Sequence, residues 1–157
     1  MSDETKIAAA KGDIMPMLLE LAADAAKAGE VPVAAAVIAV DGTILATAQN
    51  RMVRDNSALA HAETLAIAAA LRKRGTARLE DCDLWVTLEP CTMCAGAIAH
   101  ARLRRIYFAA CDAKAGAVES GVRFFDQPSC HHKPEIYGGL SEEAAARQLR
   151  DFFAARR

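Results

Sequence analysis

The pattern of apolar and polar residues divides the chain into alternating helical and extended segments. Apolar residues recur at helical spacing in two stretches, which predicts helices over Met15–Ala28 and Leu59–Arg74. The apolar runs Val33–Val40 and Ile44–Ala48 flank Asp41-Gly42, a dipeptide typical of a tight hairpin turn. We therefore predict two antiparallel strands between the two helices.

The second half of the chain has the pattern of a parallel crossover. A predicted strand at Leu84–Leu88 is followed by a helix at Cys91–Ala101 and a strand at Arg105–Ala109. Residues 112–134 are rich in Gly, Ser and Pro and predict a long loop, after which Ser141 is the expected N-cap of a last helix. These elements predict one domain of the α/β class, spanning residues 1–157, in which helices cover a mixed sheet.

The large apolar residues of these elements are the expected core, and much of the remaining apolar content is alanine, which adds little buried area. The core candidates are Leu18, Leu21, Val37, Ile38, Leu45, Leu65, Leu84, Val86, Ile98, Ile106, Phe108, Leu149 and Phe152.

Composition excludes several classes of protein. The chain has 157 residues and a formal net charge of -1, which suits one domain with a substantial core. Residues 1–6 are mostly polar or charged and lack the apolar stretch of a signal peptide. The longest apolar run, Val31–Val40, contains Pro32 and is far shorter than the roughly 20 residues that span a bilayer. We therefore expect a cytoplasmic protein without a membrane segment.

Two short segments carry residues suited to metal chemistry. His61 and Glu63 supply an imidazole and a carboxylate, and Cys91 and Cys94 supply two thiols. Zinc prefers four nitrogen or sulfur ligands, and a site with three protein ligands keeps the fourth position for water or substrate. We predict one zinc ion per chain on His61, Cys91 and Cys94, with Glu63 as the catalytic acid and base.

Both segments are expected at helix starts. Pro90 suits the first position of a helix, which places Cys91 and Cys94 in a first turn where the helix dipole favours thiolates. His61 and Glu63 are two residues apart and would diverge by about 200° within a helix, so their helix is expected to begin at the metal.

The cysteine pair alone has other interpretations. A C-x-x-C is also typical of a redox pair or a structural zinc site. A structural zinc would need a fourth protein ligand, and a redox pair would leave His61 and Glu63 without a role. The other cysteines, Cys82, Cys111 and Cys130, show no disulfide framework.

The residues around the site resemble a known family, the zinc-dependent cytidine and deoxycytidylate deaminases, and within it the tRNA-specific adenosine deaminases. The matching stretches are 30–33, 50–51, 61–63, 86–98, 101–102, 112–114, 138–139 and 152–153. The resemblance implies a three-layer α/β/α cytidine-deaminase-like fold with a mixed five-stranded sheet. It also implies a homodimer that deaminates the wobble adenosine of a tRNA anticodon stem-loop to inosine.

The same resemblance implies roles in substrate binding. Asn50 is expected to hydrogen-bond the purine, Asp112 to contact a ribose, and Lys114 to reach the RNA backbone. The remaining residues expected to line the substrate site are Val33, Ala62, Glu89 and Pro90.

Three departures from the family pattern are expected to affect substrate fit rather than zinc chemistry. Ala34 stands where the family usually has glycine, and its methyl group is expected to narrow the approach of a base to the backbone. Residues 57–59 replace a usual Asp-Pro-Thr, and Cys111 replaces a longer polar residue.

Basic residues on the last helix leave two interpretations open. Arg147, Arg150 and Arg157 fall within a sector of about 80° and form either a ridge that contacts RNA phosphates or a solvated helix face. Two other functions also remain open: a deaminase of free nucleobases or nucleotides, of the guanine or cytosine type, and a non-catalytic zinc-containing RNA-binding subunit.

Overall fold

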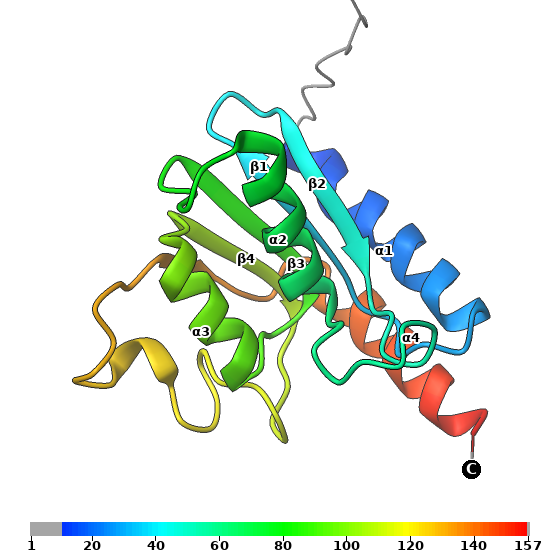
Figure 1. Cartoon of the computed structure of the whole chain (residues 1–157). Helices are drawn as coiled ribbons and strands as arrows, with labels where there is room; N and C mark the ends of the chain where they lie inside the picture. The colour runs from blue at the N-terminus through cyan, green and yellow to red at the C-terminus, as the bar shows by residue number, and fades with distance from the viewer. Residues whose placement is uncertain (1–10, 157) are drawn as a thin grey trace, which may run out of the picture.

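The computed structural model describes residues 11–156 and shows a sheet between two layers of helices (Figure 1). In chain order its elements are α1 (Lys11–Lys27), β1 (Ala34–Ala39), β2 (Ile44–Gln49), α2 (Ala62–Arg74), β3 (Cys82–Leu88), α3 (Thr92–Ala101), β4 (Arg105–Ala110), the 3-10 helix η1 (Phe124–Asp126), β5 (Glu135–Tyr137) and α4 (Glu142–Ala154).

The five strands form one mixed sheet in the order β2-β1-β3-β4-β5. β1 pairs antiparallel with β2 and with β3, whereas β3, β4 and β5 run parallel. Helices α2 and α3 cover one face of the sheet, and α1 and α4 cover the other (Figure 1). The predicted three-layer fold with a mixed five-stranded sheet is confirmed.

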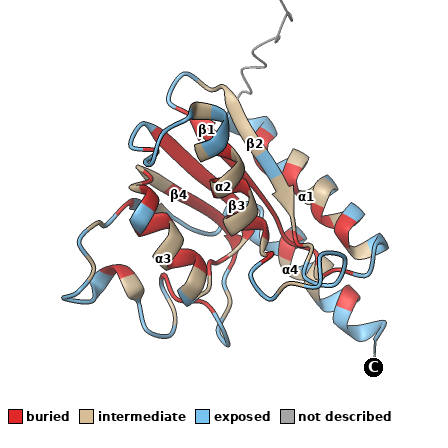
Figure 2. Ribbon diagram, in the orientation of Figure 1, coloured by how far each residue is buried: buried red, intermediate tan, exposed pale blue. Residues whose placement is uncertain are grey.

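The sheet separates two hydrophobic cores. Side chains of a strand alternate between its faces, so Ala35 and Val37 pack under α2 and α3 while Ala36 and Ile38 pack under α1. Buried residues line β1, β3 and β4 (Figure 2). Burial on both faces explains why β1 is a near-continuous apolar run rather than an alternating one.

The helices at the predicted metal site begin later than the sequence pattern suggested. α2 begins at Ala62 instead of Leu59, and α3 begins at Thr92. Pro90 therefore precedes the N-cap residue, Cys91, and does not occupy the first helical position. Periodicity cannot locate these starts because a cap residue has an extended backbone and its side chain leaves the helical pattern.

At the other helices, α1 extends back at least to Lys11, four residues before Met15, which was the predicted start. Ser141 lies at the N-cap of α4, but its φ of 58° is left-handed and its side chain makes no capping hydrogen bond. β5 lies between the loop predicted at residues 112–134 and the expected N-cap Ser141, where the pattern predicted no element, and its three residues are too few to leave a pattern.

Most of the predicted core residues are buried, but Leu21, Leu45, Leu65 and Leu149 are only partly buried. All five cysteines are free thiols. Within residues 11–156, no helix combines the length and apolar character needed to cross a membrane.

Candidate active site

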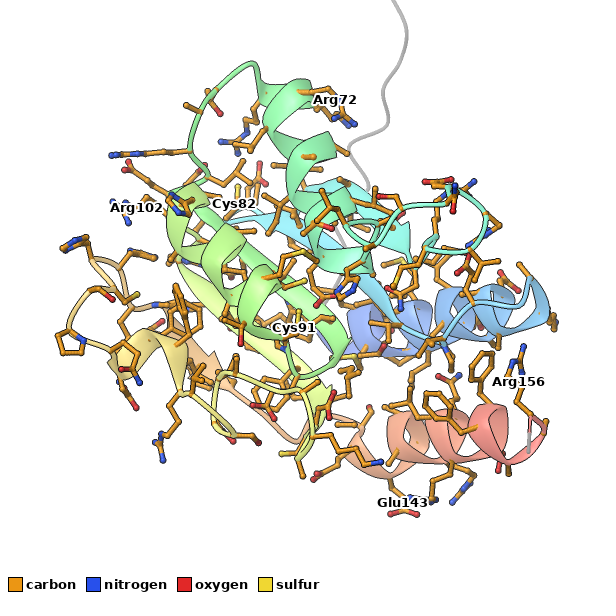
Figure 3. The ribbon with its side chains drawn as sticks, turned by 60° about the horizontal axis from the view of Figure 1, so that its bottom comes forward. Arg72, Cys82, Cys91, Arg102, Glu143 and Arg156 are labelled. Atoms are coloured by element: carbon orange, nitrogen blue, oxygen red, sulfur yellow. The ribbon has the colours of Figure 1, made fainter. Side chains whose placement is uncertain are left out.

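The starts of α2 and α3 lie at one edge of the sheet, beyond the carboxyl end of β3 (Figures 1 and 3). His61 is the N-cap residue of α2 and Cys91 is the N-cap residue of α3. Both have extended backbones, with ψ of 151° and 176°, and neither side chain caps its own helix. The two side chains are therefore available to a ligand at the point where the helices converge.

The ligand atoms have the spacing of a zinc site. His61 Nδ1 lies 3.6 Å from Cys91 Sγ and 3.4 Å from Cys94 Sγ. With Zn–S of about 2.3 Å and Zn–N of about 2.0 Å, tetrahedral angles place such atoms roughly 3.5–3.8 Å apart. Among the described residues, this is the only cluster of three or more His, Cys, Asp or Glu side chains that can share one ion. The residues fit the predicted zinc ion.

The two thiols differ in their protonation. A hydrogen bond from the Cys94 thiol, helped by the neighbouring His61 imidazole, lowers the pKa of Cys91 to about 4. The same hydrogen bond, together with burial, raises the pKa of Cys94. Cys91 is thus ready to bind as a thiolate, and Cys94 releases a proton when metal binds. The positive ends of two helix dipoles favour both thiolates.

Glu63 is buried beside this cluster. It occupies the second position of α2 and is 4% exposed. Burial raises the pKa of its carboxyl group, against a hydrogen bond with the Cys94 thiol that lowers it. Because His61 is outside the helix and Glu63 is inside its first turn, one helix start presents both side chains to the same space.

Asn50 is oriented by the start of α2. Its Oδ1 accepts a hydrogen bond of 2.8 Å from the Ala62 backbone N–H, and its own N–H donates to the Val33 carbonyl at 3.1 Å. With Oδ1 occupied, the group that Asn50 offers to a ligand is the donor Nδ2. The Ala62 N–H is correspondingly committed to Asn50 and not to substrate.

Glu89 holds the loop opposite α2. Oε1 accepts hydrogen bonds from the Asp112 N–H and the Ser120 hydroxyl, and Oε2 accepts from three backbone N–H groups at residues 118–120. The Pro90 carbonyl accepts from Ala117 N–H at 2.9 Å. The Glu89 carboxylate, which we expected to line the substrate site, is therefore committed to the loop at 112–120.

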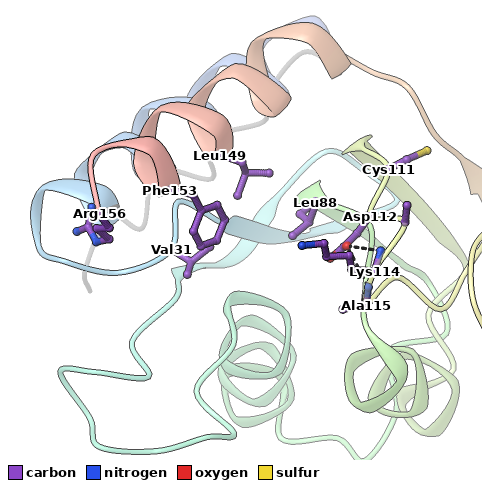
Figure 4. Close-up of a pocket in the computed structure, with 10 residues that line it drawn as sticks. Val31, Leu88, Cys111, Asp112, Lys114, Ala115, Leu149, Phe153 and Arg156 are labelled. Carbon is purple, nitrogen blue, oxygen red and sulfur yellow. Dashed lines mark hydrogen bonds between the residues drawn. The ribbon is translucent and has the colours of Figure 1, made fainter.

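A pocket of about 770 Å³ lies between α4 and the loop after β4 (Figure 4). Asp112 borders it and accepts hydrogen bonds at Oδ1 from the backbone N–H groups of Lys114 and Ala115. None of the three metal ligands lines this pocket, but Leu88 does, three residues before Cys91.

Comparison with known proteins identifies the family. Residues 9–110 match the zinc-binding region of the cytidine and deoxycytidylate deaminases. The tRNA-specific adenosine deaminase of Agrobacterium fabrum is 50% identical over 143 residues, which cover 91% of this chain and 93% of that one. This chain belongs to the tRNA-specific adenosine deaminases of that family.

Solved structures of related deaminases share the fold. A structure from a study of A-to-I editing by tRNA:A34 deaminases is 48% identical in sequence, with a TM-score of 0.86. The alignment covers 88% of this chain and 100% of that one. A guanine deaminase from Nitrosomonas europaea is 28% identical, with a TM-score of 0.80 over 93% of this chain and 86% of its own.

The departures from the usual deaminase pattern lie in different places. Ala34 is fully buried in the core under α1, so its methyl group faces away from the zinc side of the sheet and cannot narrow the substrate site as we had expected. Cys111 is exposed and lines the pocket beside Asp112. Leu59, in the altered stretch before His61, is 66% exposed.

The two arginines of α4, Arg147 and Arg150, lie on one face of the helix, and neither of them lines the pocket. Arg147 and Arg150 both lie close to Glu143 Oε1, at 3.7 and 3.6 Å, and Glu143 points outward from α4 (Figure 3). The pocket is lined instead by Arg156, whose guanidinium stacks on the Phe152 ring at 3.5 Å. Sequence periodicity gave no signal for Arg156, and Arg157 lies outside the described residues.

Proposed function

We propose that this deaminase hydrolyses the wobble adenosine of a tRNA anticodon stem-loop to inosine and ammonia. The observation that carries the proposal is a three-ligand zinc site with a buried carboxylate, Glu63, beside it. The tRNA-specific adenosine deaminase from Agrobacterium fabrum, at 50% identity, supports the choice of substrate.

The proposed chemistry assigns one role to each residue. Zinc, when bound by His61, Cys91 and Cys94, supplies a Lewis acid that lowers the pKa of water toward neutrality. Glu63 accepts a proton from the attacking water and delivers it to purine N1; it then takes the remaining proton of that water from the hydroxyl formed at C6 and passes it to the amine, which leaves as ammonia. Its burial beside the cluster excludes bulk water from these transfers.

The substrate contacts are proposed from the residues around the cluster. Asn50 Nδ2 donates to the purine, Val33 and Pro90 line the base site, and Asp112 contacts a ribose. Flanking nucleotides lie in the pocket between Lys114 and α4, which an unstacked anticodon loop can reach.

A guanine deaminase is the second candidate, because a guanine deaminase shares the fold over 93% of this chain. A panel of substrates separates the two: inosine formation in an anticodon stem-loop, beside release of ammonia from guanine, cytosine and adenosine. Turnover of the stem-loop without turnover of guanine, cytosine or free adenosine supports the proposal. Turnover of guanine alone overturns it, and zinc content without any turnover would revive a purely RNA-binding role.

The arginine ridge has its own test in RNA binding. If Arg147 and Arg150 contact phosphates, replacing both with alanine lowers the slope of log affinity against log salt by roughly 0.7 per lost contact. Arg156→Ala serves as the comparison, since Arg156 lines the pocket. An unchanged slope in the double variant identifies the ridge as a solvated face.

We further propose a cytoplasmic homodimer, as the family resemblance implies. Exposed apolar side chains in the loop before α2, at Met52, Val53 and Leu59, are 37%, 71% and 66% exposed and offer a surface for a second copy. Light scattering on the zinc-loaded protein tests the dimer, and a monomer at micromolar concentration contradicts it.

A further inference from the structure

Glu30 is a buried carboxylate outside the zinc cluster, and it accepts hydrogen bonds from the loop before α2. It is 2% exposed and lies three residues after the end of α1. Its Oε1 accepts a hydrogen bond of 3.0 Å from Val53 N–H, and its Oε2 accepts 2.9 Å from Arg54 N–H and 3.1 Å from Arg54 Nε. The loop at residues 53–54 is therefore tied to the end of α1.

Arg54 connects this carboxylate to Asn50. One of its terminal nitrogens, Nη2, donates at 2.7 Å to the Asn50 carbonyl and at 2.7 Å to Gln49 Oε1. A planar guanidinium offers these donors in a fixed arrangement, so its orientation on Glu30 determines where the Asn50 backbone is held. The Asn50 side chain then meets Ala62 N–H at the start of α2.

The arrangement determines which group Asn50 offers. Its backbone is held through its N–H by Val33 and through its carbonyl by Arg54, and its Oδ1 is held by Ala62. A rotated carboxamide would direct NH2 at the Ala62 N–H and lose that hydrogen bond. Only the Nδ2 donor is therefore presented to a base.

We propose that Glu30 and Arg54 form a positioning pair that holds the Asn50 carboxamide with its donor toward purine N7. This inference rests on the proposed function. In adenine the ring nitrogens nearest C6 are N1 and N7, and N1 is the atom that Glu63 protonates. N7 is then the acceptor left for Asn50.

Single-turnover deamination of two stem-loops tests the pair, one with adenosine and one with 7-deazaadenosine at the target position. In the zinc-loaded wild type, loss of N7 slows the reaction about ten-fold, the size of one hydrogen bond. In Asn50→Ala the two substrates react at about the same rate. In Arg54→Ala the ratio falls to about two-fold, because the donor is no longer held in place.

Arg74→Ala is the matched control. The Arg74 side chain is 30% exposed, against 28% for Arg54, and it makes two hydrogen bonds with Asp81 at the far end of α2. We expect this variant to keep the ten-fold ratio. A full ratio in Arg54→Ala, whatever its absolute rate, reduces Arg54 to a structural role and overturns the proposal.

Hydrogen exchange of the Ala62 amide provides a readout without substrate. Arg54→Ala should speed this exchange about ten-fold relative to wild type, whereas Arg74→Ala should not. Unchanged Ala62 exchange in Arg54→Ala overturns the pair even if no RNA is turned over. If the wild type deaminates both stem-loops equally, the N7 contact is wrong and the deaminase function stands; if it deaminates neither, the proposed function fails.

Discussion

The two helix starts that meet at the metal contribute different things. The start of α3 supplies two of the three ligands, Cys91 and Cys94. The start of α2 supplies one ligand, His61, and also Glu63 and the N–H that orients Asn50. In the proposed mechanism, most of the metal ligands therefore come from the start of α3, and the groups for proton transfer and base recognition come from the start of α2.

A buried glutamate holds the chain near each helix start, Glu89 near α3 and Glu30 near α2, and the two carboxylates differ in the groups that donate hydrogen bonds to them. Glu89 accepts its five hydrogen bonds from four backbone N–H groups and one hydroxyl. Glu30 shares its charge with Arg54, whose side chain is 28% exposed. Glu30 also accepts two backbone N–H hydrogen bonds, but its charge partner is one side chain that a substitution can remove, whereas no substitution removes the four backbone donors of Glu89.

The largest effect is expected on the α3 side. The double variant Cys91→Ser, Cys94→Ser should fall from about one zinc per chain to almost none and lose all turnover, because a neutral hydroxyl is a far poorer ligand than a thiolate. Elemental analysis measures this, with Cys130→Ser as the control that keeps zinc. Full zinc occupancy in the double variant would contradict the ligand assignment.

On the α2 side, Glu63→Gln should separate chemistry from metal binding. Turnover should fall about 10²–10⁴-fold while zinc content stays near one per chain, since a positioned acid and base is lost and no ligand is. Single-turnover rates and elemental analysis are measured on the same preparation. Loss of zinc in this variant would mean that Glu63 is a metal ligand, and the assignment of different roles to the starts of α2 and α3 would be wrong.

A substitution at Gly116 tests whether the loop at residues 112–120, which Glu89 holds, is rigid. A Cβ there would lie 2.4 Å from the Asp112 carbonyl oxygen and 2.6 Å from Glu89 Cδ. Gly116→Ala should therefore lower the free energy of unfolding by about 1–3 kcal/mol. Gly96→Ala is the control: its Cβ has open space, with Phe124 at 4.0 Å, and within a helix it should raise stability by about 0.5–1 kcal/mol. If urea unfolding gives the two variants the same change in unfolding free energy, the loop at residues 112–120 moves to make room for the added methyl group.

The smallest effect concerns the charge of Glu30. Burial alone raises its pKa, but hydrogen bonds from the backbone of Arg54 and Val53 and from the Arg54 guanidinium outweigh burial, so the pKa lies below the ordinary 4.5. A carboxylate whose pKa is lowered by folding stabilises the protein above its unfolded pKa, and this stabilisation is lost as the pH falls through the folded value.

We therefore expect the difference in unfolding free energy between wild type and Glu30→Gln to be constant from about pH 7 to about pH 5.5 and to shrink below about pH 4.5. Urea unfolding at a series of pH values measures it. A difference that grows on acidification would mean that the pKa is raised.

Much of the site could be predicted from the sequence because its residues occur in pairs that are close together in the chain. His61 and Glu63, like Cys91 and Cys94, are close neighbours in the chain, so their common chemistry is legible without a fold. Helix boundaries were less accessible: the pattern began α2 at Leu59, since it does not distinguish an apolar loop residue from a helical one.

Other residues had no local signal. Arg54 and Arg156 matter through partners far away in the chain or through the pocket that they border, and nothing in their immediate neighbours distinguishes them from solvated arginines. Glu89 was recognised, but its role was not, because the donors that it meets lie at residues 112–120.

The sequence by itself determined which chemical groups are available, a zinc ligand set and an acid, and the order of helices and strands that carries them. These follow from side-chain chemistry and from periodicities of 3.6 and 2 residues, which are properties of short segments. Only the tertiary structure decided that residues 61 and 91 come within 3.6 Å of each other, and that Glu30 reaches Asn50 through Arg54. Such contacts depend on how α2 and α3 pack against one face of the sheet. Packing brings together segments that are far apart in the chain, and their separation in sequence does not reveal their distance in space.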